Sequence, residues 1–218
     1  MAEPPWLLHG EGLLAWCAPP PSLPAAVPPR VAALPGPAAV VAMRYDDSPV
    51  GAYCELSVLV PARVGLRPGM CVVAMAVTSA DARLECRRLW GLPAEVGTLR
   101  WEADGRDRAM VWEGRGITVR AHRTRHALAA LVPVRSLQWR DGGPVVAPRR
   151  LRARVALARC HVGVDDGDDA LAWMAGAHRG LVIQGASIVA SAARRPAGML
   201  SSVPWRERVL PTPAEPAG

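Results

Sequence analysis

Two carboxylates, Glu55 and Glu95, are the residues of this chain whose types and setting suit acid–base chemistry. Glu55 lies in residues 53–57, where alternation along a strand places Tyr53, Glu55 and Ser57 on one face. If both carboxylates faced one cavity and burial drove their pKa values apart, they could serve as general acid and general base. The alternative is that Glu55 is an ordinary solvent-facing strand carboxylate.

The chain contains no lysine, so all 26 Lys+Arg residues are arginines. A guanidinium stays protonated and cannot act as an amine nucleophile, which leaves the N-terminus as the only aliphatic amine. Phe and Asn are also absent, while Ala, Arg, Pro and Gly are abundant. This bias is typical of GC-rich coding, so composition alone gives no functional reason for the missing lysine.

The bulk composition predicts a folded protein with a net positive charge. The chain has 218 residues, half of them hydrophobic, with a formal net charge of +7, which permits attraction to polyanions or acidic small molecules. The arginine-rich run of residues 149–154 is interpreted as a solvated strand face. Because no recognition motif accompanies the charge, we expect neither nucleic acid nor a membrane as a partner.

No motif in the sequence predicts a metal or a cofactor. The five cysteines show no CxxC spacing, and residues 165–169 lack the glutamate that an EF-hand loop requires. No G-x-S-x-G elbow frames a nucleophilic serine. An odd cysteine count and a start without a basic-then-apolar signal favour a reducing, cytoplasmic setting.

Hydrophobic patterning predicts many short strands and two helices. One helix is expected over residues 79–90, capped by Ser79 or Asp81 and ended by Gly91. A second is expected to start at an aspartate of residues 165–169 and to run to Arg179. The remaining segments are strand-like, with expected strands at residues 12–17, 38–45, 53–60, 70–78, 98–103, 109–113, 117–122, 131–140, 145–147, 151–162 and 181–193.

This order of elements indicates an α+β fold, mainly an antiparallel β-cone or barrel with flanking helices. Residues 1–37 are expected to form a proline-rich segment packing on the barrel, residues 38–209 the barrel domain, and residues 210–218 a loose tail. A closed barrel of this kind can hold a small ligand.

Residues 44–56 (RYDDSPVGAYCEL), residues 84–95 (LECRRLWGLPAE) and the weaker motif of residues 134–138 (VRSLQ) together resemble the acetoacetate decarboxylase superfamily. The resemblance implies an antiparallel β-cone, a small keto acid as substrate, no cofactor and assembly into a homo-oligomer. In the family, two lysines follow the proline of the second motif. The first forms a Schiff base with the ketone, and the second lowers its pKa by charge repulsion.

The present chain departs from that pattern at the reactive position. Ala94 and Glu95 stand where the resemblance places the two lysines, so Schiff-base decarboxylation lacks its nucleophile. Glu55 matches a family glutamate and Arg87 matches a family arginine on the preceding helix. The family's N-terminal, substrate-orienting arginine has no counterpart near residues 9–12.

Two functions therefore remain open from the sequence. One is a protein that keeps the cavity, lacks the lysine chemistry and binds a small keto or carboxylate metabolite, with Arg44, Tyr53, Arg87 and Ala94 as candidate ligand-binding residues. The other is a lysine-independent lyase, hydratase or isomerase that uses Glu55 and Glu95 as acid and base.

Overall fold

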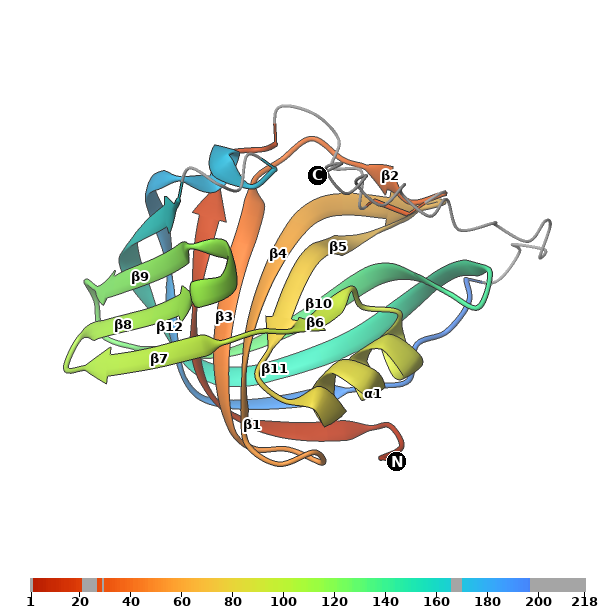
Figure 1. Cartoon of the computed structure of the whole chain (residues 1–218), viewed down its shortest axis with the longest axis horizontal. Coiled ribbons are helices and arrows are strands. Elements are labelled where there is room, and N and C mark those ends of the chain that lie inside the picture. The colour runs from red at the N-terminus through yellow and green to blue at the C-terminus, as the bar shows by residue number, and fades with distance from the viewer. Residues whose placement is uncertain (1, 21–26, 29, 166–169, 197–218) are drawn as a thin grey trace, which may run out of the picture.

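The computed structural model describes residues 2–20, 27–28, 30–165 and 170–196. It is a mostly antiparallel β structure with one α-helix in the described residues (Figure 1). The helix is α1 (Ala80–Trp90), and the short 3-10 turns are η1 (Glu113–Arg115) and η2 (Ala172–Met174). The strands are β1 (Trp6–Cys17), β2 (Ala32–Ala33), β3 (Ala38–Asp47), β4 (Tyr53–Val64), β5 (Arg67–Val77), β6 (Ala94–Val96), β7 (Leu99–Asp104), β8 (Asp107–Trp112), β9 (Ile117–Arg123), β10 (Leu128–Arg140), β11 (Gly143–Val164) and β12 (Gly176–Ala190).

The sheet closes on itself into a ring. Its strands follow the order β10-β5-β4-β3-β1-β12-β11, and β11 pairs back with β10 through a long antiparallel ladder. Strands β9, β8 and β7 continue from β11 as a branch outside the ring, called the flap below (left in Figure 1). The predicted antiparallel cone or barrel is therefore confirmed.

Strands β3, β4 and β5 form a layer that is buried on both faces. Alternate residues enter two separate hydrophobic clusters, because successive side chains of a strand point to opposite sides. The helix-side core contains Met43, Met75 and Trp90. The flap-side core contains Leu56 and Met110. Any polar side chain on this layer therefore faces an apolar environment on one side or the other.

Helix α1 begins and ends at the residues that the sequence predicts. The Ser79 side chain accepts a hydrogen bond from the Ala82 backbone N–H at 3.2 Å, and Gly91 ends the helix in the left-handed conformation. Trp90 fixes the helix to the sheet, since its ring meets Trp6 edge-on at 5.0 Å and its Nε1 donates to the Ser191 carbonyl at 2.8 Å. The helix thus delivers the chain to β6 at a fixed position.

The prediction of a second helix, from residues 165–169 to Arg179, is wrong. The described part of that segment contains only the turn η2 before β12 begins at Gly176, and Arg179 lies within β12. β12 pairs with both β1 and β11 over most of its length. Two ladders of backbone hydrogen bonds override the local helical pattern, because tertiary pairing outweighs intrinsic propensity. Part of the predicted capping loop, residues 166–169, lies outside the described residues.

The N-terminal segment is more integral than the sequence suggests. β1 pairs with β3 and β12, so it is a strand of the ring itself rather than a segment that packs on it. The predicted tail of residues 210–218 lies outside the described residues. In the part of the chain that the structure describes, no helix has the length and apolar character needed to cross a bilayer.

Gly91 provides a test of how α1 is seated. Its φ is 65°, and an added Cβ would overlap the Trp139 carbonyl. We expect Gly91→Ala to lower the free energy of unfolding by about 3–5 kcal/mol, from backbone strain together with the clash. Urea denaturation gives the value.

Gly65→Ala is the matched control. Gly65 has a φ of 59°, but an added Cβ there would meet open space. It should therefore cost only the backbone strain, about 1–2 kcal/mol. Equal losses for the two variants would contradict the close packing of Gly91 on β10.

Candidate functional site

Glu55 lies on the helix-side face of the doubly buried layer. On β4 it pairs with Met43 of β3 and with Val77 of β5, and both partners belong to the helix-side core. Its side chain is 6% exposed. The structure therefore places Glu55 in the interior and not on the solvent-facing side of a strand.

A hydrogen bond from a neighbouring hydroxyl holds the Glu55 carboxyl. Ser57, two residues along β4 on the same face, donates from its Oγ to Glu55 Oε1 at 2.9 Å. Burial raises the pKa of Glu55, while the Arg149 guanidinium and the Ser57 hydroxyl oppose that rise. The net change is upward, so Glu55 holds a proton more readily than a solvated carboxyl does.

Arg149 of β11 supplies the positive charge near Glu55. Its guanidinium lies over the Trp90 ring at 5.4 Å, and its Nε is buried without a hydrogen-bond partner among the described residues. Burial lowers the pKa of Arg149 and the Glu55 carboxylate raises it, with a net upward change. A buried guanidinium N–H without a partner is well suited to meet an anion.

The two tyrosines of the whole chain meet beside this pair of charges. Tyr45 and Tyr53 have ring centroids 4.8 Å apart, and both are buried. Burial raises the pKa of each phenol well above its ordinary value. Proximity to Glu55 adds to the rise for both, and for Tyr53 so does proximity to Tyr45. Both hydroxyls therefore remain protonated and can donate hydrogen bonds at neutral pH.

Strand β10 presents two further polar groups on the same side of the sheet. Ser136 pairs with Ala147, so it shares a face of the sheet with Arg149 two residues further along β11. Its Oγ is buried without a hydrogen-bond partner among the described residues. Gln138 is buried next to it and donates from Nε2 to the Val72 carbonyl at 3.2 Å. We call Tyr45, Tyr53, Glu55, Ser57, Ser136, Gln138 and Arg149 the interior polar cluster.

Ala94 is fully buried in the helix-side core. It lies on β6, which runs parallel to β5 with Ala94 opposite Met75. Because Met75 and Val77 share a face of β5, the methyl group of Ala94 points to the same side of the layer as Glu55. The position where the resemblance places a reactive lysine therefore faces the interior polar cluster and carries a methyl group.

The structure does not bring Glu95 to Glu55. Neighbouring residues of a strand point in opposite directions, so Glu95 lies on the other face of β6 from Ala94. There it forms an ion pair with Arg115 at 3.3 Å, and its side chain is 45% exposed. An acid–base pair of Glu55 and Glu95 in one cavity lacks its geometry.

Arg44 is also separated from Glu55 by strand alternation. It pairs with Cys54 and therefore faces away from the side on which Tyr45 lies. Its guanidinium contacts Glu11 and Asp46, each at 3.1 Å. The cation near Glu55 is Arg149 and not Arg44, so Arg44 lies apart from the candidate ligand-binding residues Tyr53 and Ala94.

Arg87 acts outside the interior polar cluster. It is exposed on α1 and donates from Nε to the Ala94 carbonyl at 2.8 Å. This contact ties the helix to the start of β6. Arg87 therefore positions the backbone at Ala94, and its guanidinium is not directed toward Glu55.

Little in the sequence points to Arg149, which stands in an arginine-rich run expected to be solvated. Alternation along β11 could have found it, because Arg150, Arg152 and Arg154 are exposed while Arg149 is partly buried. Among the described residues, no group of three or more His, Cys, Asp or Glu side chains could hold a metal ion. A hollow of about 370 Å³ lies elsewhere, on the flap.

The model of the family described as acetoacetate decarboxylase matches residues 13–146. The chain belongs to the acetoacetate decarboxylase family. The match spans β3, β4, α1 and β6, and so includes Glu55 and Ala94. A search of curated protein sequences found no significant match.

Several solved structures share the fold of this chain. The enduracididine biosynthesis enzyme MppR, complexed with pyruvate, superposes with a TM-score of 0.69 at 16% identity, covering 89% of this chain and 91% of that chain. Acetoacetate decarboxylase from Legionella pneumophila subsp. pneumophila str. Philadelphia 1 gives 0.66 at 14% identity, covering 89% and 88%. An acetoacetate decarboxylase-like enzyme from Sphingomonas wittichii RW1 gives 0.64 at 15% identity, covering 90% and 94%.

The raised pKa of Glu55 predicts a pH-dependent difference between wild type and Glu55→Gln. The folded state holds the Glu55 proton more tightly than the unfolded chain, whose carboxyl has the ordinary value near 4.5. The tighter proton binding stabilises the folded state. The stabilisation is complete below the unfolded pKa of Glu55 and is lost as the pH rises through the higher pKa of the folded state. Each tenfold difference in proton affinity between the two states corresponds to about 1.4 kcal/mol.

Urea unfolding from pH 4 to pH 8 tests this directly. The stability of Glu55→Gln relative to wild type should increase with pH, whatever the constant offset between the two. Glu95→Gln, which removes an exposed carboxylate, is the control. If the stability of Glu55→Gln relative to wild type stays flat or falls with rising pH, the ionised Glu55 carboxylate is not destabilised in the folded state.

Proposed function

We propose that the protein binds a small keto or carboxylate metabolite at the interior polar cluster and does not decarboxylate it through a Schiff base. Two features of the helix side together carry the proposal. The Arg149 Nε–H is buried and has no hydrogen-bond partner among the described residues, and position 94 carries a methyl group. The first provides a partner for a carboxylate. The second removes the amine that the family chemistry requires.

The arrangement of the polar groups suits a molecule that carries a carboxylate and a carbonyl. A carboxylate can accept hydrogen bonds from the Arg149 guanidinium, which Trp90 holds from one side. Protonated phenols of Tyr45 and Tyr53 are donors for a carbonyl oxygen. Glu55, when protonated, adds a further donor. The relative MppR binds pyruvate, a molecule of this class.

A second candidate function is proton transfer at a carbon next to the carbonyl. The raised pKa of Glu55 favours it, because a carboxyl whose pKa lies closer to neutrality exchanges protons efficiently. Glu55 would remove the proton, and a phenol would hydrogen-bond the developing enolate oxygen. This candidate uses Glu55 without Glu95. Deuterium incorporation from D₂O into pyruvate, abolished by Glu55→Gln, would be its signature.

Ligand binding should depend on Arg149. We expect Arg149→Met to weaken the binding of pyruvate and acetoacetate about 10- to 100-fold, the loss of one charge-assisted hydrogen-bonded contact. Isothermal titration calorimetry measures the affinity. Arg150→Met is the matched control, since Arg150 is the adjacent arginine on the opposite, exposed face of β11. Equal affinity for Arg149→Met and Arg150→Met would overturn the proposed site.

The wild-type protein should form no reducible adduct with keto acids. Incubation with acetoacetate and sodium borohydride, followed by peptide mass mapping, should leave every peptide beyond the N-terminal one unmodified, because no lysine is present to form an iminium. Ala94→Lys places an amine on the interior face and serves as the comparison. A borohydride-stable adduct on the wild-type chain, mapped to the region around residue 94, would disprove the absence of this chemistry.

A further inference from the structure

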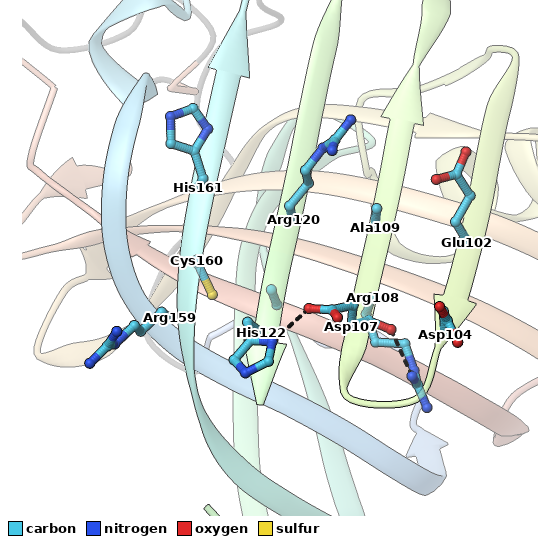
Figure 2. Close-up of a pocket in the computed structure, with 11 residues that line it drawn as sticks. Glu102, Asp104, Asp107, Arg108, Ala109, Arg120, His122, Arg159, Cys160 and His161 are labelled. Carbon is cyan, nitrogen blue, oxygen red and sulfur yellow. Dashed lines mark hydrogen bonds and ion pairs between the residues drawn. The ribbon is translucent and has the colours of Figure 1, made fainter. Parts of the chain in front are cut away.

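The flap carries a hollow of about 370 Å³ that is distinct from the interior polar cluster (Figure 2). Its lining comes from β7, β8, β9 and β11. Glu102 pairs with Ala109, Ala109 with Arg120, and Arg120 with His161, so these four side chains form one row on one face of the sheet. A second row contains Asp104, Asp107, His122 and Arg159. Figure 2 shows both rows side by side.

The charged side chains of the two rows are sorted by sign. The acidic side chains Glu102, Asp104 and Asp107 stand on β7 and β8, and the basic side chains Arg120 and Arg159 stand on β9 and β11. Between them in the first row lies Ala109, which is 9% exposed and whose small side chain forms the floor. The hollow thus has an acidic wall, a basic wall and a small apolar floor.

The two walls do not neutralise each other fully. Asp107 contacts His122 at 2.7 Å, and Glu102 pairs with Arg100 on its own strand at 3.2 Å. Arg108, which also lines the hollow, already forms an ion pair with Glu11 at 2.9 Å. Within the described residues, neither Arg120, Arg159 nor Asp104 has an ion pair or a side-chain hydrogen bond. Each wall therefore keeps charge that a ligand can meet.

The separation of the walls sets the size of the ligand. Glu102 and Arg120 stand on strands that are two spacings apart, or about 10 Å at roughly 4.8 Å per spacing. With both side chains standing perpendicular to the sheet, their charged ends are separated by about the same distance. A hydrogen bond of about 2.9 Å at each end leaves roughly 4 Å between the charged groups of a bound molecule. This span suits an ammonium and a carboxylate that are joined through two or three carbons.

We propose that the hollow on the flap binds a short zwitterion of the β- or γ-amino acid type. Its carboxylate contacts Arg120, with Arg159 and His161 beside it. Its ammonium contacts Glu102 and Asp104. The methylene groups between them pass over Ala109. A molecule with a single charge meets only one wall, so both charges are required for binding.

NMR titration of histidine-labelled protein tests the proposal with β-alanine, 4-aminobutanoate, 6-aminohexanoate, propanoate and propylamine as probes. We expect saturable shifts of the His122 and His161 ring signals at millimolar β-alanine or 4-aminobutanoate. Propanoate, propylamine and 6-aminohexanoate should bind at least about fivefold more weakly, which corresponds to the loss of roughly one exposed ion pair. Propanoate that matches the zwitterions would overturn the proposal, as would the absence of any saturable shift.

Variants locate the binding. Glu102→Gln and Arg120→Gln each remove one wall and should each weaken binding about fivefold or more. Ala109→Leu fills the floor and should abolish binding, with its folding verified by circular dichroism. Arg179→Gln is the control, because Arg179 lies one strand further along the same row as Arg159 and outside the lining. An effect of Arg179→Gln equal to that of Arg120→Gln would reduce the hollow to general surface charge and overturn the site.

The hollow on the flap lies apart from the interior polar cluster. Arg149 lies over Trp90 on the helix side of the molecule, and the part of β11 that pairs with the flap begins only at Ala158. Arg149→Met should therefore leave the zwitterion titration unchanged while it weakens keto-acid binding. Loss of zwitterion binding in Arg149→Met would show that the observed shifts originate at the interior polar cluster and would overturn a separate site on the flap.

Discussion

The register of β4 between β3 and β5 is the constraint on which the interior site depends. Because this layer is buried on both faces, each residue of β4 enters either the helix-side core or the flap-side core. A slip by one residue would exchange Glu55 and Ser57 for Leu56 and Cys54, and would remove both hydrogen-bonding partners from the helix side. The closed ring holds that register, since β3 and β5 are themselves fixed by β1 and β10.

In the interior polar cluster, the balance between Glu55 and Arg149 sets the charge of each group. A buried carboxyl and a buried guanidinium each lose hydration, and each reduces the cost of the other. Glu55 responds by holding its proton more strongly, whereas Arg149 stays charged. The result is an interior polar cluster with a permanent cation, weakly acidic phenols and a methyl group at position 94.

The sequence predicts the parts of this fold that depend on local chemistry. Ser79 and Gly91 mark the ends of α1 because capping groups and left-handed glycine act within one turn. The alternation of polar and apolar residues around Glu55 is also visible in the sequence, because it too is a local pattern. The prediction of a helix that ends at Arg179 failed. Residues 176–179 belong to β12, whose conformation is set by ladders to β1 and β11 that no local pattern reveals. The facing of Arg44 and Glu95, and the burial of Arg149, likewise depend on which side of a strand meets a core, and this is known only once the strands are paired.

Within the part of the chain that the structure describes, ring closure leaves few exposed backbone edges. β7 is the last strand of the flap, and its outer edge has no neighbouring strand in the described structure. An open edge of this kind can recruit a strand from another molecule and so begin aggregation. Arg100, Glu102 and Asp104 alternate along β7 and are all exposed. An incoming strand would have to bring these charges against its own side chains, so the same residues that give the flap its polarity also protect the protein from edge-to-edge association.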